Sequence, residues 1–313
     1  MVQPDFTWES LKNSNMKKSI IILFILPLVI GCIRLDGLVF LADNSIDSYK
    51  FDLYEGEVEI DLPDSIYSMP DSFIMPVTFE SKIEGEDAKV LYAAYIGNYN
   101  NILTDKIIVY CHGQTDHMDY YWNRTKLLAQ LAFSDQMAVF TFDYRGYGLS
   151  EGTPSEEGMN ADVRGALNWL KQQGVSANNI ILYGFSLGSA PATDAAAYFE
   201  EFKAYKLILE SPFASADNLA QVSTIINTSA KYFLEMKINN ADKIKDVDQD
   251  LLWMHGTKDD YIHIDNGELV YKNHGGSYKE AHRIEGAKHG TDGVPETMGF
   301  EEYLDVVRTF ILR

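Results

Sequence analysis

The sequence has few cysteines and lacks the common metal-binding motifs. Its 313 residues include two cysteines, Cys32 and Cys111, which are too few for a disulfide framework or a cysteine-based zinc site. The spacing H-E-x-x-H of zinc proteases is also absent. We therefore expect no metal and no cofactor. Cys111 ends an apolar run and is expected to be a small, buried hydrophobic residue.

Basic residues and linkers are also scarce. The chain has 26 Lys and Arg against 46 Asp and Glu, a formal net charge of −20. A surface this acidic repels nucleic acid, so we expect no nucleic-acid partner. No Pro-, Gly- or Ser-rich linker follows residue 70, and 46% of the residues are hydrophobic, which favours one domain over 73–313. Residues 32–72 are acidic and irregular, and we expect a tether and an element that packs on this domain.

No apolar run reaches the roughly 20 residues needed to span a membrane, but a shorter run lies near the N-terminus. Lys17 and Lys18 precede the apolar residues 20–30, and a small residue and Cys32 follow, as in a secretory signal peptide. Residues 29–32 resemble a bacterial lipobox, whose cysteine is lipidated and becomes the first residue of the mature chain. The alternatives are a simple N-terminal anchor and an uncleaved signal.

The same region raises the question of the translation start. We expect translation to begin at Met16, so that residues 1–15 come from a misannotated start and the rest of 1–31 is the lipoprotein signal peptide. Lipidation of Cys32 would give an extracytoplasmic, membrane-anchored protein. Ile33 follows the cysteine where an aspartate would favour the inner membrane, so we expect the outer membrane.

From residue 106 onward, short apolar runs alternate with longer amphipathic ones. This pattern predicts βαβ units and a mostly parallel sheet, flanked by helices. Strands are predicted at 106–111, 137–143, 179–183, 205–210, 249–255 and 278–284, and helices at about 117–132, 155–173, 187–200, 263–273 and 297–312. Residues 73–79 and 89–96 flank a turn and predict an antiparallel hairpin at one edge. Residues 214–248 do not follow this alternation of apolar and amphipathic runs, and they form either a minimal cap or a long crossover.

Residues 184–188 form a G-x-S-x-G pentapeptide centred on Ser186. A predicted strand precedes the pentapeptide and a predicted helix follows it, which is the context of a nucleophile elbow. The flanking glycines leave room where a Cβ would collide with a neighbouring strand or helix. The alternative is an ordinary Gly/Ser turn.

A serine nucleophile needs a base, and the base needs a carboxylate that orients it. On such a sheet the acid and then the histidine follow the serine in loops after later strands. Asp259 is the predicted acid, with Asp260 as the alternative, and His289 is the predicted base. His112 and His255 stand at strand ends before glycine, and we expect structural roles for both.

An oxyanion formed during attack needs at least two hydrogen-bond donors. Leu187 N–H, at the start of the helix after the serine, is the first predicted donor. The second should come from the loop after the strand that ends at Cys111. Gln114 N–H is the candidate there, with Gly113 and Thr115 as alternatives.

Five motifs occur in a fixed order along the chain: residues 112–113, 142–150, 184–188, 255–259 and 286–289. Together they resemble the α/β-hydrolase superfamily, and most of all its branch of Bem46-like and prolyl-oligopeptidase-like esterases, over about 73–313. The resemblance implies an α/β-hydrolase fold with a minimal cap. It also implies Ser186 as nucleophile, Asp259 as acid, His289 as base, and Leu187 and Gln114 at the oxyanion hole.

One loop departs from the family pattern, because residues 116–122 are rich in aromatic side chains. Tyr121 and Trp122 form either a pocket wall or, as we favour, the core face of the first helix.

The expected function is a serine hydrolase that cleaves carboxylic esters of small molecules or acyl groups. A serine peptidase or a thioesterase would use the same three side chains, and the sequence does not separate these activities. A third alternative is a catalytically idle envelope lipoprotein with a binding role. The sequence does not determine the substrate or the oligomeric state.

Overall fold

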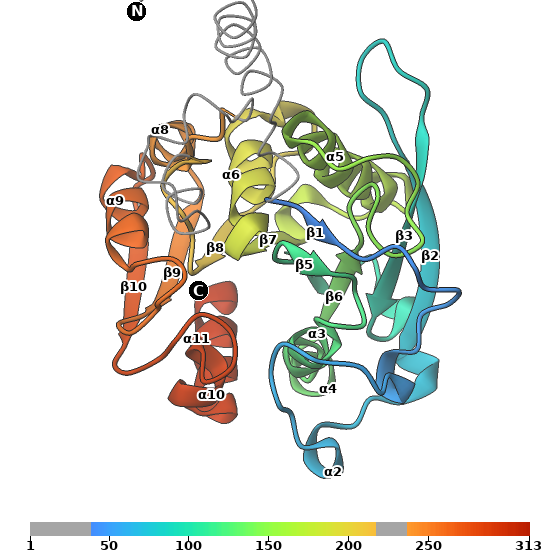
Figure 1. Ribbon diagram of the computed structural model, residues 1–313, viewed down its shortest axis with the longest axis horizontal. Helices are drawn as coiled ribbons and strands as arrows, with labels where there is room; N and C mark the ends of the chain where they lie inside the picture. Colours follow the sequence, from blue (N-terminus) through green and yellow to red (C-terminus); the bar gives the residue numbers. More distant parts are fainter. Residues whose placement is uncertain (1–38, 217–236) are drawn as a thin grey trace, which may run out of the picture.

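The computed structural model describes residues 39–216 and 237–313 (Figure 1). The predicted signal peptide, Cys32 and the start of the predicted tether lie outside the described residues, as does most of 214–248. Within the described ranges, no helix is long and apolar enough to cross a membrane.

Eight strands form one sheet in the order β10-β9-β8-β7-β4-β6-β3-β2. The strands are β2 (Ile74–Ser81), β3 (Lys89–Ile96), β4 (Lys106–Cys111), β6 (Met137–Phe142), β7 (Ile180–Phe185), β8 (Lys206–Glu210), β9 (Asp250–Gly256) and β10 (Lys279–Ile284). The hairpin β2–β3 is antiparallel, β3 is antiparallel to β6, and all other pairs are parallel. Strands β6, β7 and β8 are buried along their whole length, because helices cover both faces of the sheet.

The helices form two layers, one on each face of the sheet (Figure 1). On one face lie α5 (Glu156–Gln172), α6 (Ser189–Tyr198) and α9 (Asp265–Asn273), with α8 (Asn240–Lys243) beside α6. On the other lie α3 (Trp122–Ala129), α4 (Leu131–Ser134), α10 (Val294–Met298) and α11 (Phe300–Leu312). This three-layer arrangement confirms the predicted α/β-hydrolase fold with an antiparallel hairpin at one edge.

Two predicted helices have different bounds in the structure. The helix predicted over 117–132 begins only at Trp122, because the Asp119 carboxylate accepts the backbone N–H groups of Lys50 and Phe51 and holds the preceding residues in a turn. The helix predicted over 297–312 is divided between α10 and α11, since Gly299 has a φ of 91°, which a continuous α-helix does not allow.

Residues 39–72 pack on the domain. Strand β1 (Leu41–Ala42) pairs with β5 (Thr115–Asp116), and Asp52 accepts a hydrogen bond from the indole of Trp122 at 2.7 Å. Around the short helix α2 (Asp64–Tyr67), the segment contributes buried side chains to the core beneath α3: Ile60, Leu62, Tyr67 and Met69. The segment therefore covers the loop that follows β4.

The described ends of the predicted excursion at 214–248 lie close together. Ser215 and Asn239 form an isolated bridge, and Ala216 N–H donates to the Ile238 carbonyl at 2.9 Å. Residues 217–236 lie outside the described residues, so the choice between a cap and a crossover stays open.

Candidate active site

Ser186 stands in the sharp turn between β7 and α6. Its φ of 52° lies in the left-handed region that few non-glycine residues adopt, and such strain is common at active sites. A Cβ on Gly184 would lie 2.6 Å from the Ser189 Cα, and one on Gly188 would lie 2.0 Å from the Cys111 carbonyl oxygen. The two glycines therefore allow the turn to fit between α6 and β4.

We expect Gly188→Ala to destabilise the protein by about 3 kcal/mol or more, because backbone atoms of β4 cannot move aside. Urea unfolding of both proteins, with the midpoint compared at constant slope, measures this difference. Gly290→Ala is the matched control, since a Cβ there meets no atom within 4 Å. Equal stability of Gly188→Ala and the wild type would contradict the described turn.

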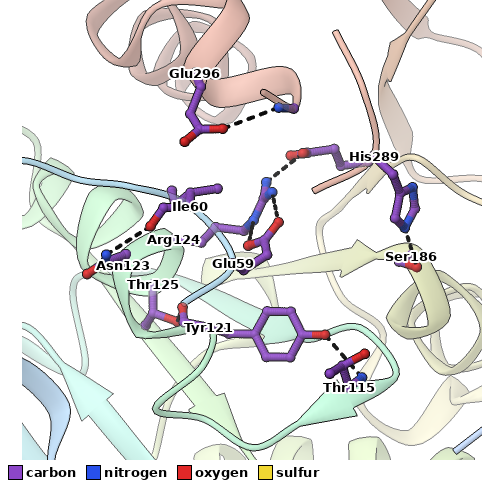
Figure 2. Close-up of polar contacts among 12 residues, drawn as sticks. Glu59, Ile60, Thr115, Tyr121, Asn123, Arg124, Thr125, Ser186, His289 and Glu296 are labelled. Atoms are coloured by element: carbon purple, nitrogen blue, oxygen red, sulfur yellow. Dashed lines mark hydrogen bonds and ion pairs between the residues drawn. The ribbon is translucent and has the colours of Figure 1, made fainter. Parts of the chain in front are cut away.

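Ser186, His289 and Asp259 form a continuous chain of hydrogen bonds. His289 Nε2 lies 2.8 Å from Ser186 Oγ (Figure 2), and His289 Nδ1 lies 2.8 Å from Asp259 Oδ2. Asp260, the alternative acid, is exposed, whereas Asp259 is 4% exposed. In this geometry an imidazole can take the serine proton while a carboxylate stabilises the resulting cation.

Asp259 is held from several sides. Its Oδ1 accepts the backbone N–H groups of Tyr261 and Ile262 at 3.0 and 2.7 Å. His255 Nε2 lies 3.2 Å from Asp259 Oδ2 and 2.8 Å from the Ile262 carbonyl oxygen. Burial alone would raise the pKa of Asp259, but the hydrogen bonds from His255 and His289 hold that pKa below its ordinary value. Asp259 is therefore ionised at neutral pH, and the buried His255 contacts it directly.

One predicted oxyanion donor belongs to the turn of Ser186, and the other belongs to the loop after β4. Leu187 is the next residue in the 3-10 turn Ser186–Gly188. Thr115 N–H is already used, since it donates to the Tyr121 hydroxyl at 3.2 Å (Figure 2). Gln114 N–H, in contrast, donates to no protein group within the described part of the chain, while the Gln114 carbonyl accepts the Tyr147 hydroxyl at 2.9 Å. This pattern excludes Thr115, whereas the N–H groups of Gln114 and of the alternative Gly113 both have no acceptor in the described part of the chain.

A small cavity of about 160 Å³ opens beside Ser186. The cavity is lined by Glu59, Gln114, Thr115, Tyr120, Tyr121, Phe185, Ser186, Tyr261, His289 and Gly290. Tyr121 forms part of this wall, whereas Trp122 packs in the core. Tyr121 is also a buried member of this core, so the favoured interpretation holds for both residues, and Tyr121 lines the pocket as well.

Three residues at this site could not be recognised from the sequence. Glu59 comes from the irregular N-terminal segment, and buried Arg124 of α3 pairs with it. Tyr261 packs against the imidazole of His289 at 5.0 Å between ring centroids. No sequence motif includes Glu59 or Arg124. For Tyr261, the only sequence feature that could have indicated a role is its position, as an aromatic residue in the loop after Asp259.

One group of side chains could hold a metal ion within the described residues: Asp43, Asp116 and His117. Asp119 N–H donates to His117 Nδ1 at 3.3 Å, which places the ring proton on Nε2. Nε2 lies 3.3 Å from Asp116 Oδ1, so the imidazole already donates to a carboxylate. This pairing accounts for the cluster without a metal.

Comparisons with known proteins match the same region. A family model described as alpha/beta hydrolase fold matches residues 106–223. Alpha/beta hydrolase domain-containing protein 17C of Xenopus tropicalis is 33% identical over 174 residues, covering 55% of this chain and 52% of that protein. Protein 17B of Homo sapiens is 34% identical over 137 residues, covering 43% of this chain and 44% of that protein. The chain therefore spans about half the length of these curated relatives.

Solved structures match over more of the chain. An esterase from Pyrococcus furiosus has a TM-score of 0.62 at 17% identity and covers 88% of this chain and 98% of its own. An esterase from Exiguobacterium antarcticum has a TM-score of 0.55 at 17% identity, covering 75% of this chain and 99% of its own. At these identities the likeness establishes the fold.

Proposed function

We propose that this chain, which has the α/β-hydrolase fold, is a serine hydrolase that cleaves carboxylic esters. The observation that carries the proposal is the chain of hydrogen bonds from Ser186 through His289 to ionised Asp259, beside a cavity that reaches the serine hydroxyl. The resemblance to Bem46-like and prolyl-oligopeptidase-like esterases and the esterases among the structural neighbours also support ester hydrolysis.

The proposed reaction runs through an acyl-enzyme. Ser186 Oγ attacks the ester carbonyl carbon while His289 Nε2 takes its proton, and Asp259 stabilises the imidazolium. The N–H groups of Leu187 and Gln114 bind the oxyanion. His289 then gives the proton to the leaving alcohol, and a water activated by the same imidazole hydrolyses the acyl-serine. Apart from the substrate and water, each step uses only groups of this chain, so no cofactor is proposed.

We expect a preference for short acyl chains. A cavity of about 160 Å³ is small beside the roughly 300–1,000 Å³ of most ligand pockets, so long acyl groups do not fit inside it. Hydrolysis of p-nitrophenyl esters from acetyl to palmitoyl measures this preference. kcat/KM for the acetyl or butyryl ester should exceed that for the palmitoyl ester at least about tenfold, a difference of about 1.4 kcal/mol. If kcat/KM rises steadily with acyl chain length, the cavity does not limit the length of the acyl group, and this prediction is wrong.

The same ester series separates the proposal from its alternatives. Absence of turnover on all of these esters, with the protein folded, would exclude a simple esterase. Matched amide and thioester substrates would then distinguish a peptidase from a thioesterase, and absence of turnover on every class would leave an idle binding protein.

We also propose that Cys32 carries a lipid that anchors the protein at the extracytoplasmic side of a bacterial membrane. This proposal depends on the sequence of residues 16–33 alone. Globomycin blocks the signal peptidase of lipoproteins, so treated cells should accumulate a longer precursor. An unchanged electrophoretic mobility of the protein would contradict lipidation.

A further inference from the structure

A buried ionic cluster lies next to the candidate active site. Arg124 is fully buried, and its guanidinium group binds two carboxylates. Its Nε donates to Glu59 Oε2 at 2.7 Å and its Nη2 donates to Glu59 Oε1 (Figure 2). Its Nη1 donates to Glu210 Oε1. When both carboxylates are ionised, they and the one guanidinium leave an uncompensated negative charge, which is costly away from water.

The two carboxylates differ in their surroundings. Glu210, at the end of β8, is fully buried and accepts hydrogen bonds from the hydroxyls of Tyr183 and Tyr303. Glu59 lines the cavity that also contains Ser186 and His289. Burial raises the pKa of Glu59 above its ordinary value, and the paired Arg124 guanidinium opposes that rise only in part. Of the two carboxylates, Glu59 is therefore the one that a ligand in the cavity can reach.

Aromatic rings form much of the remaining wall. Tyr120, Tyr121, Phe185 and Tyr261 line the cavity together with Glu59. The Phe185 ring already carries the Arg124 guanidinium 4.2 Å from its centroid and stacks on the His289 imidazole. The three tyrosine rings are therefore the ones left for a ligand. Faces of aromatic rings attract cations, and the attraction is stronger where water is excluded. A carboxylate combined with aromatic walls favours a cationic group over a neutral or an anionic one.

We propose that Glu59 and the rings of Tyr120, Tyr121 and Tyr261 form a subsite for a substituted ammonium group of the substrate. The proposal rests on the proposed function, because it assigns this group to the ester that Ser186 attacks. An ammonium group in the cavity would neutralise the cluster and donate to the free lone pairs of the Glu59 carboxylate. A hydroxyl could form such a hydrogen bond but would leave the negative charge uncompensated.

Binding of a small probe tests the subsite without any reaction. The Kd of n-butylammonium chloride for the full chain is measured by calorimetry and compared with the Kd of 1-butanol, which has similar size and no charge. We expect butylammonium to bind at least tenfold more tightly. Equal or weaker binding of butylammonium would overturn the proposal, and this comparison needs no variant.

Two matched variants then locate the binding. Glu59→Gln and Glu210→Gln each remove one carboxylate partner of Arg124, but only Glu59 reaches the cavity. Both variants remove the uncompensated charge, but only Glu59→Gln also removes the carboxylate that lines the cavity. Glu59→Gln should therefore weaken butylammonium binding at least tenfold, and at least threefold more than Glu210→Gln does. Equal losses in both variants would show a general charge effect and would contradict a subsite at Glu59.

A pair of isosteric esters connects the subsite to catalysis. Ethyl 3-aminopropanoate and ethyl butanoate differ by an ammonium group in place of a methyl group. The wild type should have the higher kcat/KM for the amino ester, and Glu59→Gln should reduce this preference at least tenfold. Hydrolysis of ethyl butanoate without any preference would contradict the subsite alone. Butylammonium binding through Glu59 without hydrolysis of either ester would contradict the proposed function alone.

Discussion

Ser186→Ala is expected to lower kcat for p-nitrophenyl acetate at least about 10⁴-fold, because removal of the nucleophile from a triad leaves only binding and oxyanion stabilisation. The Oγ of Ser186 is the atom in contact with His289 Nε2, at 2.8 Å. Steady-state kinetics of the two purified proteins, with circular dichroism spectra to compare their folds, provide the measurement.

Ser189→Ala is the matched control for this experiment. Ser189 is fully buried at the start of α6, a few residues beyond Ser186, and its hydroxyl lies 3.5 Å from Asn240 Nδ2. We expect removal of this hydroxyl to change kcat less than about threefold, because it contacts a neighbouring side chain and takes no part in the proposed reaction. Activity of Ser186→Ala close to that of the wild type would mean that another group is the nucleophile.

Asp259→Asn is expected to lower kcat by about 10³- to 10⁴-fold. The neutral amide cannot stabilise the imidazolium of His289, and its NH₂ group can turn the histidine to the wrong tautomer. The loss should appear in kcat with little change in KM, because Asp259 is buried behind His289 and does not line the cavity.

Asp260→Asn tests whether the acid has been assigned correctly. Asp260 is the next residue and is exposed, so its substitution should leave kcat within about twofold of the wild type. A larger loss in Asp260→Asn than in Asp259→Asn would contradict the role that we assign to Asp259.

The sheet could be predicted from the sequence because its strands are buried on both faces. Short continuous apolar runs such as those of β4 and β7 are typical of strands in the centre of a parallel sheet, where both faces are buried. The turn at Ser186 could be predicted for a similar local reason, since Gly184 and Gly188 are the residues that the close approach of α6 and β4 requires.

The ionic cluster and the start of α3 could not be predicted, because both depend on contacts between distant segments. Glu59 and Arg124 are 65 positions apart, and an isolated charged residue is normally interpreted as exposed. The start of α3 depends on the contact between Asp119 and Lys50, which comes from the irregular segment 39–72. Local patterns predicted the strands, the elbow and its partners, but not the residues that this segment adds to the cavity.

Covalent labelling with a fluorophosphonate is the most direct test of the central claim, that Ser186 is an activated nucleophile in a serine hydrolase. The reagent phosphonylates serines that an adjacent base activates, and peptide mass spectrometry identifies the labelled residue. We predict one adduct, on Ser186, that forms in the wild type and is lost in His289→Ala. Absence of an adduct on the folded wild-type protein, or an adduct on a different serine, would contradict the account.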